Sequence, residues 1–165
     1  GWYNVSTTTA NKPYDVTYAL LTVSSYFDTK IYTLTEITKG TVVRRISRSG
    51  NIGEWEYENP RMTLGVEYRT TERWESAPVY TVLLDCGNTV TNDKTQIKTD
   101  IVCGAIIRIA GRIGGYTTPY IYEVLDSRYS AWVTAHNQNG YLQVNTYASD
   151  DTGNMPVKVQ VWYTK

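Results

Sequence analysis

The stretch "YSAWVTAHNQNGYLQVNTYA", residues 129–148, contains two runs of alternating side chains separated by Asn-Gln-Asn-Gly. In the first run, Trp132 and His136 fall on one face of a strand, and the more apolar Val133 and Ala135 fall on the other. An Asn-Gly pair tolerates the positive φ of a type I′ turn. The stretch therefore predicts an antiparallel hairpin whose Trp132 and His136 point outwards or into a subunit interface.

The C-terminal run "VKVQVWYTK", residues 157–165, alternates in the same way, with its valines on one face and Lys158, Gln160 and Trp162 on the other. This pattern is typical of a strand with one face on a core and one on solvent or a neighbouring subunit. Similar runs, such as "YALLTVSSY", "KIYTLTEI", "TVVRRIS" and "VYTVLLDC", recur between turn-forming segments, and helical spacing is nearly absent. About six or seven strands with turns every 8–12 residues predict an all-β chain containing an antiparallel sandwich.

The middle of the chain lacks this periodicity. Pro60, Gly65 and Pro78 interrupt the stretch "ENPRMTLGVEYRTTERWESAPVY", which indicates a linker or crossover. We expect a boundary near Arg61 to Val66, with a small antiparallel β module at 1–62 and a β-sandwich at 63–165. In the second part, "GNTVTNDKTQIKTD" is interpreted as a polar loop, and "IVCGAIIRIAGRIGG" is apolar enough for a central strand.

The charge balance argues against a nucleic-acid-binding surface. The chain has 16 Lys+Arg and 16 Asp+Glu, and its only basic run, "VVRRISR", places Arg44 and Arg45 on opposite faces of a strand. These arginines are interpreted as solvated strand residues. No stretch approaches the ~20 apolar residues of a membrane span, so we expect no membrane insertion. No secretion signal is visible either.

Metal, cofactor and catalytic chemistry are not expected. Cys86 and Cys103 are the only cysteines, without a CxxC or Cys/His cluster. They are interpreted as buried thiols, with a disulfide as the alternative if they fall on neighbouring strands. Glu54, Glu56 and Glu58 alternate along one strand face and are interpreted as solvated charges. Nothing in the chain shows the converging carboxylates of a glycosidase, so the protein is not expected to be an enzyme.

Aromatic composition supplies the functional signal. The chain has 15 Tyr and 5 Trp but one Phe. Tyr and Trp carry a polar group, which suits half-buried faces and contact surfaces. Flat rings beside planar polar groups are what a saccharide site requires. The candidate ligand-binding residues are Tyr116, Tyr120, Tyr122, Trp132, His136 and Asn137. The alternative is that these rings pack between sheets or across a subunit seam.

Two parts of the chain resemble known families. The opening, with the aromatic strand at Trp2, "NKP" at 11–13, Arg44 and Arg45, and Trp55, resembles a small β module of bacteriophage tail fibres and tail-like bacteriocins. The remainder, from "YRTTERWESAPVYTVLLDCG" to "VQVWYTK", resembles C-terminal head domains of phage receptor-binding proteins. One departure is "ESAPVY", where the family usually has Gly-Lys before the "VY" strand.

The resemblance implies a homotrimeric adhesin at the tip of a phage tail, made in the cytoplasm of its bacterial host. Its partner would be a bacterial surface polysaccharide, bound without covalent chemistry. Three alternatives remain open. They are a structural tip that only closes the trimer, a carbohydrate-binding module of a secreted bacterial protein, and a depolymerase fragment.

Overall fold

A computed structural model describes residues 1–6, 8–14, 16–114, 122–124, 130–149 and 154–165. Among these residues there is no helix, and the all-β prediction is confirmed. No helix in this part of the chain could cross a membrane. The strands form two compact units, one of residues 1–61 and 68–72 and the other of residues 62–67 and 73–165. Each unit is described by itself.

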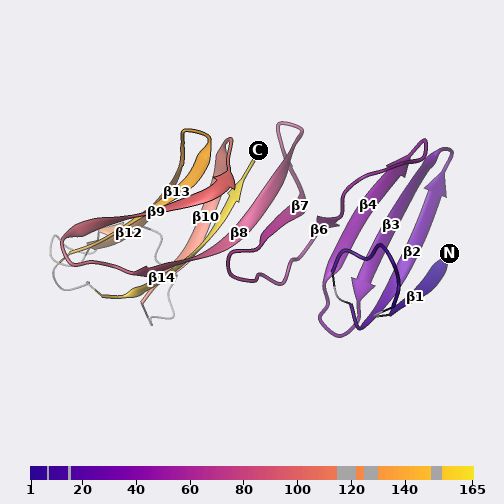
Figure 1. Cartoon of the computed structure of the whole chain (residues 1–165), viewed down its shortest axis with the longest axis horizontal. Coiled ribbons are helices and arrows are strands. Elements are labelled where there is room, and N and C mark those ends of the chain that lie inside the picture. The colour runs from indigo at the N-terminus through magenta and orange to yellow at the C-terminus, as the bar shows by residue number, and fades with distance from the viewer. Residues whose placement is uncertain (7, 15, 115–121, 125–129, 150–153) are drawn as a thin grey trace. The chain divides into compact units, whose positions relative to one another are not determined.

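Unit 1 is a single sheet in the order β1-β2-β3-β4-β6, in which β1 to β4 lie side by side (Figure 1). Its strands are β1 (Trp2–Ser6), β2 (Tyr18–Tyr26), β3 (Thr29–Glu36), β4 (Val42–Arg48), β5 (Asn51–Ile52) and β6 (Glu56–Tyr57). Neighbouring strands from β1 to β6 are antiparallel, whereas β6 also pairs in parallel with β7 (Glu67–Trp74) through Tyr57 and Thr70.

One face of the unit 1 sheet carries the core. Val5, Ala19, Leu34 and Val43 are buried there, together with Val16 from the segment between β1 and β2. Side chains on alternate positions point to the opposite face, where no comparable core forms among the described residues. Unit 1 is therefore a one-sided sheet.

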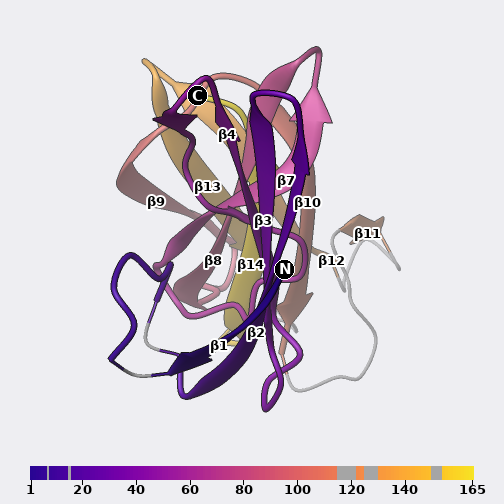
Figure 2. The same cartoon turned by 90° about the vertical axis from the view of Figure 1, so that its right-hand side faces the viewer.

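Unit 2 is built from two layers. Its strands are β8 (Ala77–Asn88), β9 (Asp93–Val102), β10 (Ile106–Ile113), β11 (Tyr122–Val124), β12 (Ser130–Gln138), β13 (Tyr141–Ala148) and β14 (Pro156–Tyr163). One layer has the antiparallel order β8-β14-β10, and the other contains β11-β12-β13. Strand β9 lies beside β13 (Figure 2). The two run in opposite directions, because the amide of Asn92 donates to Ala148 and that of Cys103 donates to Gly140, each at 2.8 Å.

The core of unit 2 lies between these layers. Val159 and Val161 of β14 pack in one cluster with Leu142 and Val144 of β13 and Val133 of β12. The predicted inward faces of β12 and β14 are thus confirmed. Burying this apolar surface is the main stabilising contribution to the unit.

Both cysteines belong to that core. Cys86 and Cys103 are free and buried, so the interpretation as buried thiols is confirmed. Burial, with a smaller effect of Asp85, raises the pKa of the Cys86 thiol to about 11, which keeps it protonated at neutral pH.

Three local predictions were wrong. The segment interpreted as a linker contains β7, joined to β8 through Glu75 and Ser76, which both have positive φ (47° and 69°). The polar loop contains β9, whose inward side chains are two threonines and two isoleucines, namely Thr95, Ile97, Thr99 and Ile101. Strand β10, expected at the centre of a sheet, lies at the end of the β8-β14-β10 order.

The division between the units can be compared with the predicted boundary near Arg61 to Val66. The chain passes from unit 1 to unit 2 after Arg61, but residues 68–72 return to unit 1. Strand β7 therefore contributes to both units. The predicted division between residues 62 and 63 instead places all of β7 in the second part of the chain.

Candidate functional site

The β12–β13 hairpin displays a polar face on the side away from the core. Its turn residues Asn139 and Gly140 have φ of 55° and 86°, as a type I′ turn requires. Directly opposite residues of antiparallel strands share a face, and His136 lies opposite Gln143. Because Val133 and Val144 point into the core, His136 and Gln143 point away from it.

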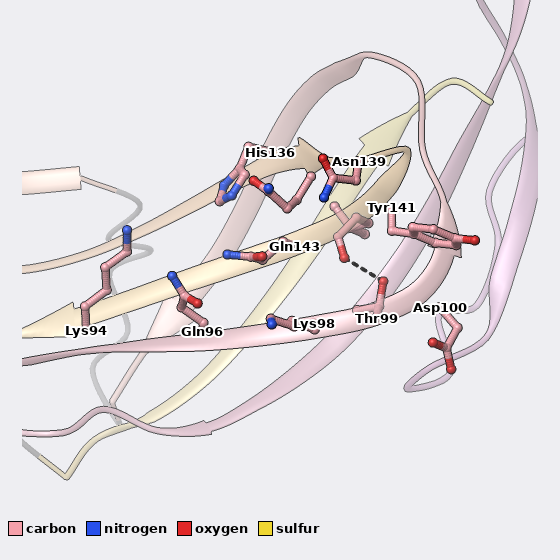
Figure 3. Close-up of a pocket in the computed structure, with 11 residues that line it drawn as sticks. Lys94, Gln96, Lys98, Thr99, Asp100, His136, Asn139, Tyr141 and Gln143 are labelled. Atoms are coloured by element: carbon pink, nitrogen blue, oxygen red, sulfur yellow. Dashed lines mark hydrogen bonds between the residues drawn. The ribbon is translucent and has the colours of Figure 1, made fainter.

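Strand β9 extends this polar face on the other side of β13. Its burial alternates along the strand, with Lys94, Gln96, Lys98 and Asp100 exposed and the residues between them partly buried. Because β9 lies beside β13, these exposed side chains stand on the same side as Gln143 (Figure 3).

Together these strands form an open cavity of about 730 Å³, here called the polar groove. Figure 3 shows side chains rising into it from β9, β12 and β13. The groove is lined by Lys94, Gln96, Lys98, Thr99, Asp100, His136, Gln138, Asn139, Tyr141, Leu142 and Gln143. Most of these side chains end in an amide, an ammonium or a hydroxyl group, so the groove offers many hydrogen-bonding groups to a polar ligand.

Two buried amides lie on this outward side. Gln143 and Asn145 have exposed fractions of 5% and 3% although they point away from the core. The Gln143 amide nitrogen donates to Asn145 Oδ1 at 3.0 Å, and Asn145 Nδ2 lies 3.2 Å from His136 Nδ1. The three side chains therefore form one hydrogen-bonded row, and a fixed row is pre-organised for recognition.

The row also fixes the state of the imidazole. Since Asn145 Oδ1 accepts from Gln143, the amide nitrogen of Asn145 must face His136. That nitrogen is a donor, so His136 Nδ1 acts as an acceptor and a neutral ring carries its proton on Nε2. His136, which lines the groove, thus offers an N–H donor.

Three aromatic side chains lie on the strands that form the groove. Tyr141 lines it and is 50% exposed. Trp132 lies opposite Tyr147 on β13, and their rings stack with centroids 5.5 Å apart and planes at 14°. Trp132 stands on the same side of the hairpin as His136, because the two positions on β12 differ by four, and Tyr147 shares that side because it lies directly opposite Trp132.

The candidate residues predicted on the hairpin have different surroundings. His136 lines the polar groove, and Trp132 shares its face. The Asn137 side chain instead donates to the carbonyls of Cys103 and Gly104 at 2.7 and 2.9 Å and accepts from the Gly140 amide at 2.7 Å. Asn137 therefore stabilises the β12–β13 turn and connects it to the segment that follows β9.

The three candidate tyrosines are less informative. Tyr122 belongs to β11, where its backbone pairs with that of Trp132. Tyr116 and Tyr120 lie outside the described residues. Their assignment as ligand-binding residues stays a prediction.

Sequence reasoning missed the groove residues of β9 and β13. The sequence predicts a loop at Lys94, Gln96 and Lys98, and it does not single out Gln143. A signal was present in "KTQIKTDIV", since Thr95, Ile97, Thr99 and Ile101 recur at every second position. Threonine is a good strand residue, but it does not mark an inward face as clearly as valine does.

Titratable groups with large pKa shifts lie outside the groove. In unit 2, burial and a hydrogen bond to the Glu67 carboxylate raise the pKa of Tyr163. In unit 1, burial and a hydrogen bond to Glu36 raise the pKa of Tyr14. Neither tyrosine belongs to the groove lining, and in the described residues no group of three metal-ligating side chains was found.

The charged residues considered in the sequence have structural partners in unit 1. Arg69 pairs with Glu54 at 2.5 Å and Glu56 at 3.0 Å, and Arg44 pairs with Glu58 at 2.9 Å. The guanidinium carbon of Arg45 lies 4.4 Å from the ring centroid of Trp55, on the core side of the sheet. The carboxylates there bind arginines of the same unit, and they do not line the polar groove.

Comparison with known proteins gives structural neighbours of one kind. No family model matches the chain, and no curated protein matches it. The P. aeruginosa R1 pyocin fibre is 10% identical with a TM-score of 0.32, over 98% of this chain and 62% of that structure. An N-truncated R2-type pyocin tail fibre is 8% identical with a TM-score of 0.35, over 98% of this chain and 90% of that structure.

These neighbours are phage-tail-like fibres, the class that the sequence motifs resemble. This chain spans less than two thirds of the R1 fibre structure that it matches. With every TM-score below 0.5, the similarity carries no argument about activity. The functional proposal rests on the polar groove.

Proposed function

We propose that unit 2 binds a bacterial cell-surface glycan in the polar groove, without covalent chemistry, as the receptor-binding part of a phage tail fibre or tail-like particle. On this proposal the chain is located at the tail tip. The groove would hold one or two sugar rings, because about 730 Å³ lies within the ordinary range of ligand pockets.

The observation that carries the proposal is the row Gln143–Asn145–His136. Buried amides are costly unless they are hydrogen-bonded, and here they are bonded to one another beneath an open cavity. Amide oxygens accept from sugar hydroxyls, and amide and imidazole N–H groups donate to them. Tyr141 adds an exposed ring at the groove, which suits the apolar face of a pyranose.

We further propose that the chain acts as a homotrimer. One shallow sugar site reaches only about millimolar affinity, near −4 kcal/mol, and several linked sites raise the overall strength of attachment. Support comes from the outward face of unit 1, where Trp2, Ile31 and Ile46 are 73%, 42% and 53% exposed. Ile31 lies directly opposite Ile46, so the two form an apolar pair that a neighbouring copy would cover.

The test is a binding measurement on an array of bacterial surface polysaccharides, followed by titration of the strongest hit. Tyr141→Ala should weaken binding at least tenfold, because it removes a ring at the groove. Tyr18→Ala is the matched control, since Tyr18 is similarly exposed, at 65% against 50%, but belongs to unit 1. Binding that survives Tyr141→Ala and is lost in Tyr18→Ala would contradict the proposed site.

The same glycan distinguishes binding from cleavage. Prolonged incubation should release no new reducing ends, because Asp100 is the only carboxylate among the groove-lining residues described and glycoside hydrolysis ordinarily needs two. Release of reducing ends would assign the chain to the depolymerases instead. An array with no binding at all would favour a structural tip.

A further inference from the structure

The charge of the side chains that line the polar groove changes sign along β9. Lys94 and Lys98 lie on either side of Gln96, and Asp100 follows at the end of the groove near Tyr141. On an extended strand Lys94 and Asp100 are roughly 20 Å apart. Figure 3 shows Asp100 at the opposite end of the labelled side chains from Lys94. One end of the groove is therefore cationic and the other anionic.

The two lysines are not neutralised by ion pairs within the described part of the chain. No carboxylate there lies within 4.0 Å of either ammonium group, whereas Lys39 and Lys165 bind Glu36 and Glu67 at 2.9 and 2.5 Å. Two ammonium groups against one carboxylate leave the groove with a positive balance. In a concave site, a positive charge of this kind attracts anions more strongly than on an open surface.

Neutral hydrogen-bonding groups stand next to these cations. Gln96 lies between the lysines. Gln143 and His136 extend into the groove from β13 and β12, which lie next to β9 in that order (Figure 3). The row that fixes His136 leaves its Nε2–H as a donor. A ligand that satisfies both sets of groups carries hydroxyls and at least one negative charge.

Resting on the proposed function, we infer that the glycan bound here is acidic, with a carboxylate or phosphate on the sugar seated against Lys94 and Lys98. The hydroxyl groups of the same sugar ring bind Gln96, Gln143 and His136. The carboxylate of Asp100 repels a second anionic group at its end of the groove. The groove therefore selects saccharides by the position of their negative charge as well as by its presence.

The experiment uses small probes and the full chain. Glucuronate, glucose 6-phosphate, glucose, the methyl ester of glucuronate and inorganic phosphate are each titrated into isotope-labelled protein, and amide shifts are followed. Comparison of the first two identifies carboxylate or phosphate as the preferred group. At least one acidic sugar should bind ten times more tightly than glucose, and the shifts should include residues 94–100 and 136–143.

Paired variants separate a specific site from general attraction. Lys94→Gln with Lys98→Gln should abolish the tenfold preference, and Lys30→Gln with Lys158→Gln should retain it, because those lysines are exposed and outside the groove. Both pairs change the net charge equally. Thermal unfolding of each pair checks that the fold is intact.

Several results would overturn the inference. They are equal binding of glucose and the acidic sugars, inorganic phosphate as tight as glucose 6-phosphate, an unchanged preference in the Lys94/Lys98 pair, or no acidic sugar bound at all. The proposed function has its own readout, the polysaccharide array with Tyr141→Ala. An array hit that depends on Tyr141 but shows no preference for charge would remove the acidic ligand and leave glycan binding standing.

Discussion

Gln143 and Asn145 are nearly inaccessible to solvent although they lie on the outward side of β13. Polar side chains at such positions ordinarily extend into water and contribute little to stability. Here they bond to each other and to His136, so their positions are fixed before any ligand arrives. The cost of ordering these side chains is therefore borne by folding rather than by binding.

At the scale of single residues, the row predicts the tautomer of His136. Nitrogen-15 spectra of the neutral imidazole should show the proton on Nε2. The physical reason is that Asn145 Nδ2 donates a hydrogen bond to His136 Nδ1 at 3.2 Å, so Nδ1 cannot carry a proton of its own. A signal from Nδ1–H would show that the row does not form as described.

At the scale of elements, the hairpin β12–β13 and the strand β14 were predictable. Asn139 and Gly140 form the turn that their residue types favour, and the valines of β14 mark the core side without ambiguity. Strand β9 gives a weaker signal, because threonine at positions 95 and 99 marks the inward face less clearly than valine does in β14. The turn after β7 uses Glu75 and Ser76 in place of glycine or asparagine, so its sequence gives no turn signal.

The candidate site was therefore only partly predictable. The sequence placed Trp132 and His136 on the outward face because alternation within one strand is local information. It could not reveal that Lys94 and Gln96 stand beside Gln143, since that depends on β9 lying beside β13, some 40 to 50 residues later in the chain. Pairings between distant strands are set by the whole core.

The β12–β13 turn supplies a prediction about stability. Asn137→Ala leaves the carbonyls of Cys103 and Gly104 and the Gly140 amide without their partner, which should cost about 1–3 kcal/mol. Gln138→Ala is the matched control, since Gln138 is the adjacent amide and lines the groove, and it should change stability by about 0.5 kcal/mol or less. Denaturant unfolding measures both. Equal losses would contradict a structural role for Asn137.

The end of β3 supplies a prediction about pH. Burial alone would raise the pKa of Glu36, but hydrogen bonds from Lys39 and Tyr14 outweigh it and hold the pKa below 4.5. A lowered pKa means that the ionised carboxylate stabilises the folded state above about pH 4.5 and that this contribution is lost as the pH falls through the folded value. The stability of unit 1 should therefore decline below that pH.

Glu36→Gln tests this effect. The variant should be less stable than the original protein at pH 7 and should show a flatter decline in acid, because the titrating group has been removed. Unfolding curves between pH 3 and pH 7, followed by amide resonances of β2 and β3 in isotope-labelled protein, provide the measurement, since both strands belong to unit 1. An equally steep acid decline in the variant would assign the effect to other carboxylates.

At the scale of the whole molecule, the two units differ in what they leave exposed. Unit 1 has a core on one side of its sheet and exposed apolar side chains on the other, including Ile31 and Ile46. Unit 2 has a core between two layers and a polar groove outside it. These differences suit a division in which unit 1 joins copies of the chain and unit 2 binds the glycan.

The trimer proposal predicts the mass in solution. Light scattering at micromolar concentration should give three times the 18.7 kDa protomer. Ile31→Lys with Ile46→Lys should reduce it to one protomer, because charges would be placed within the proposed interface. Ile37→Lys is the control, since Ile37 is 70% exposed but lies beyond the end of β3. A monomeric original protein would contradict the proposal.

The most direct test of the central claim, that the polar groove of unit 2 binds a bacterial surface glycan, is a crystal structure of the full chain with an oligosaccharide from the polysaccharide it binds. The account predicts electron density for sugar in the groove, within hydrogen-bonding distance of Gln96, His136 and Gln143. Density for the saccharide on any other surface, with the groove holding only solvent, would contradict it.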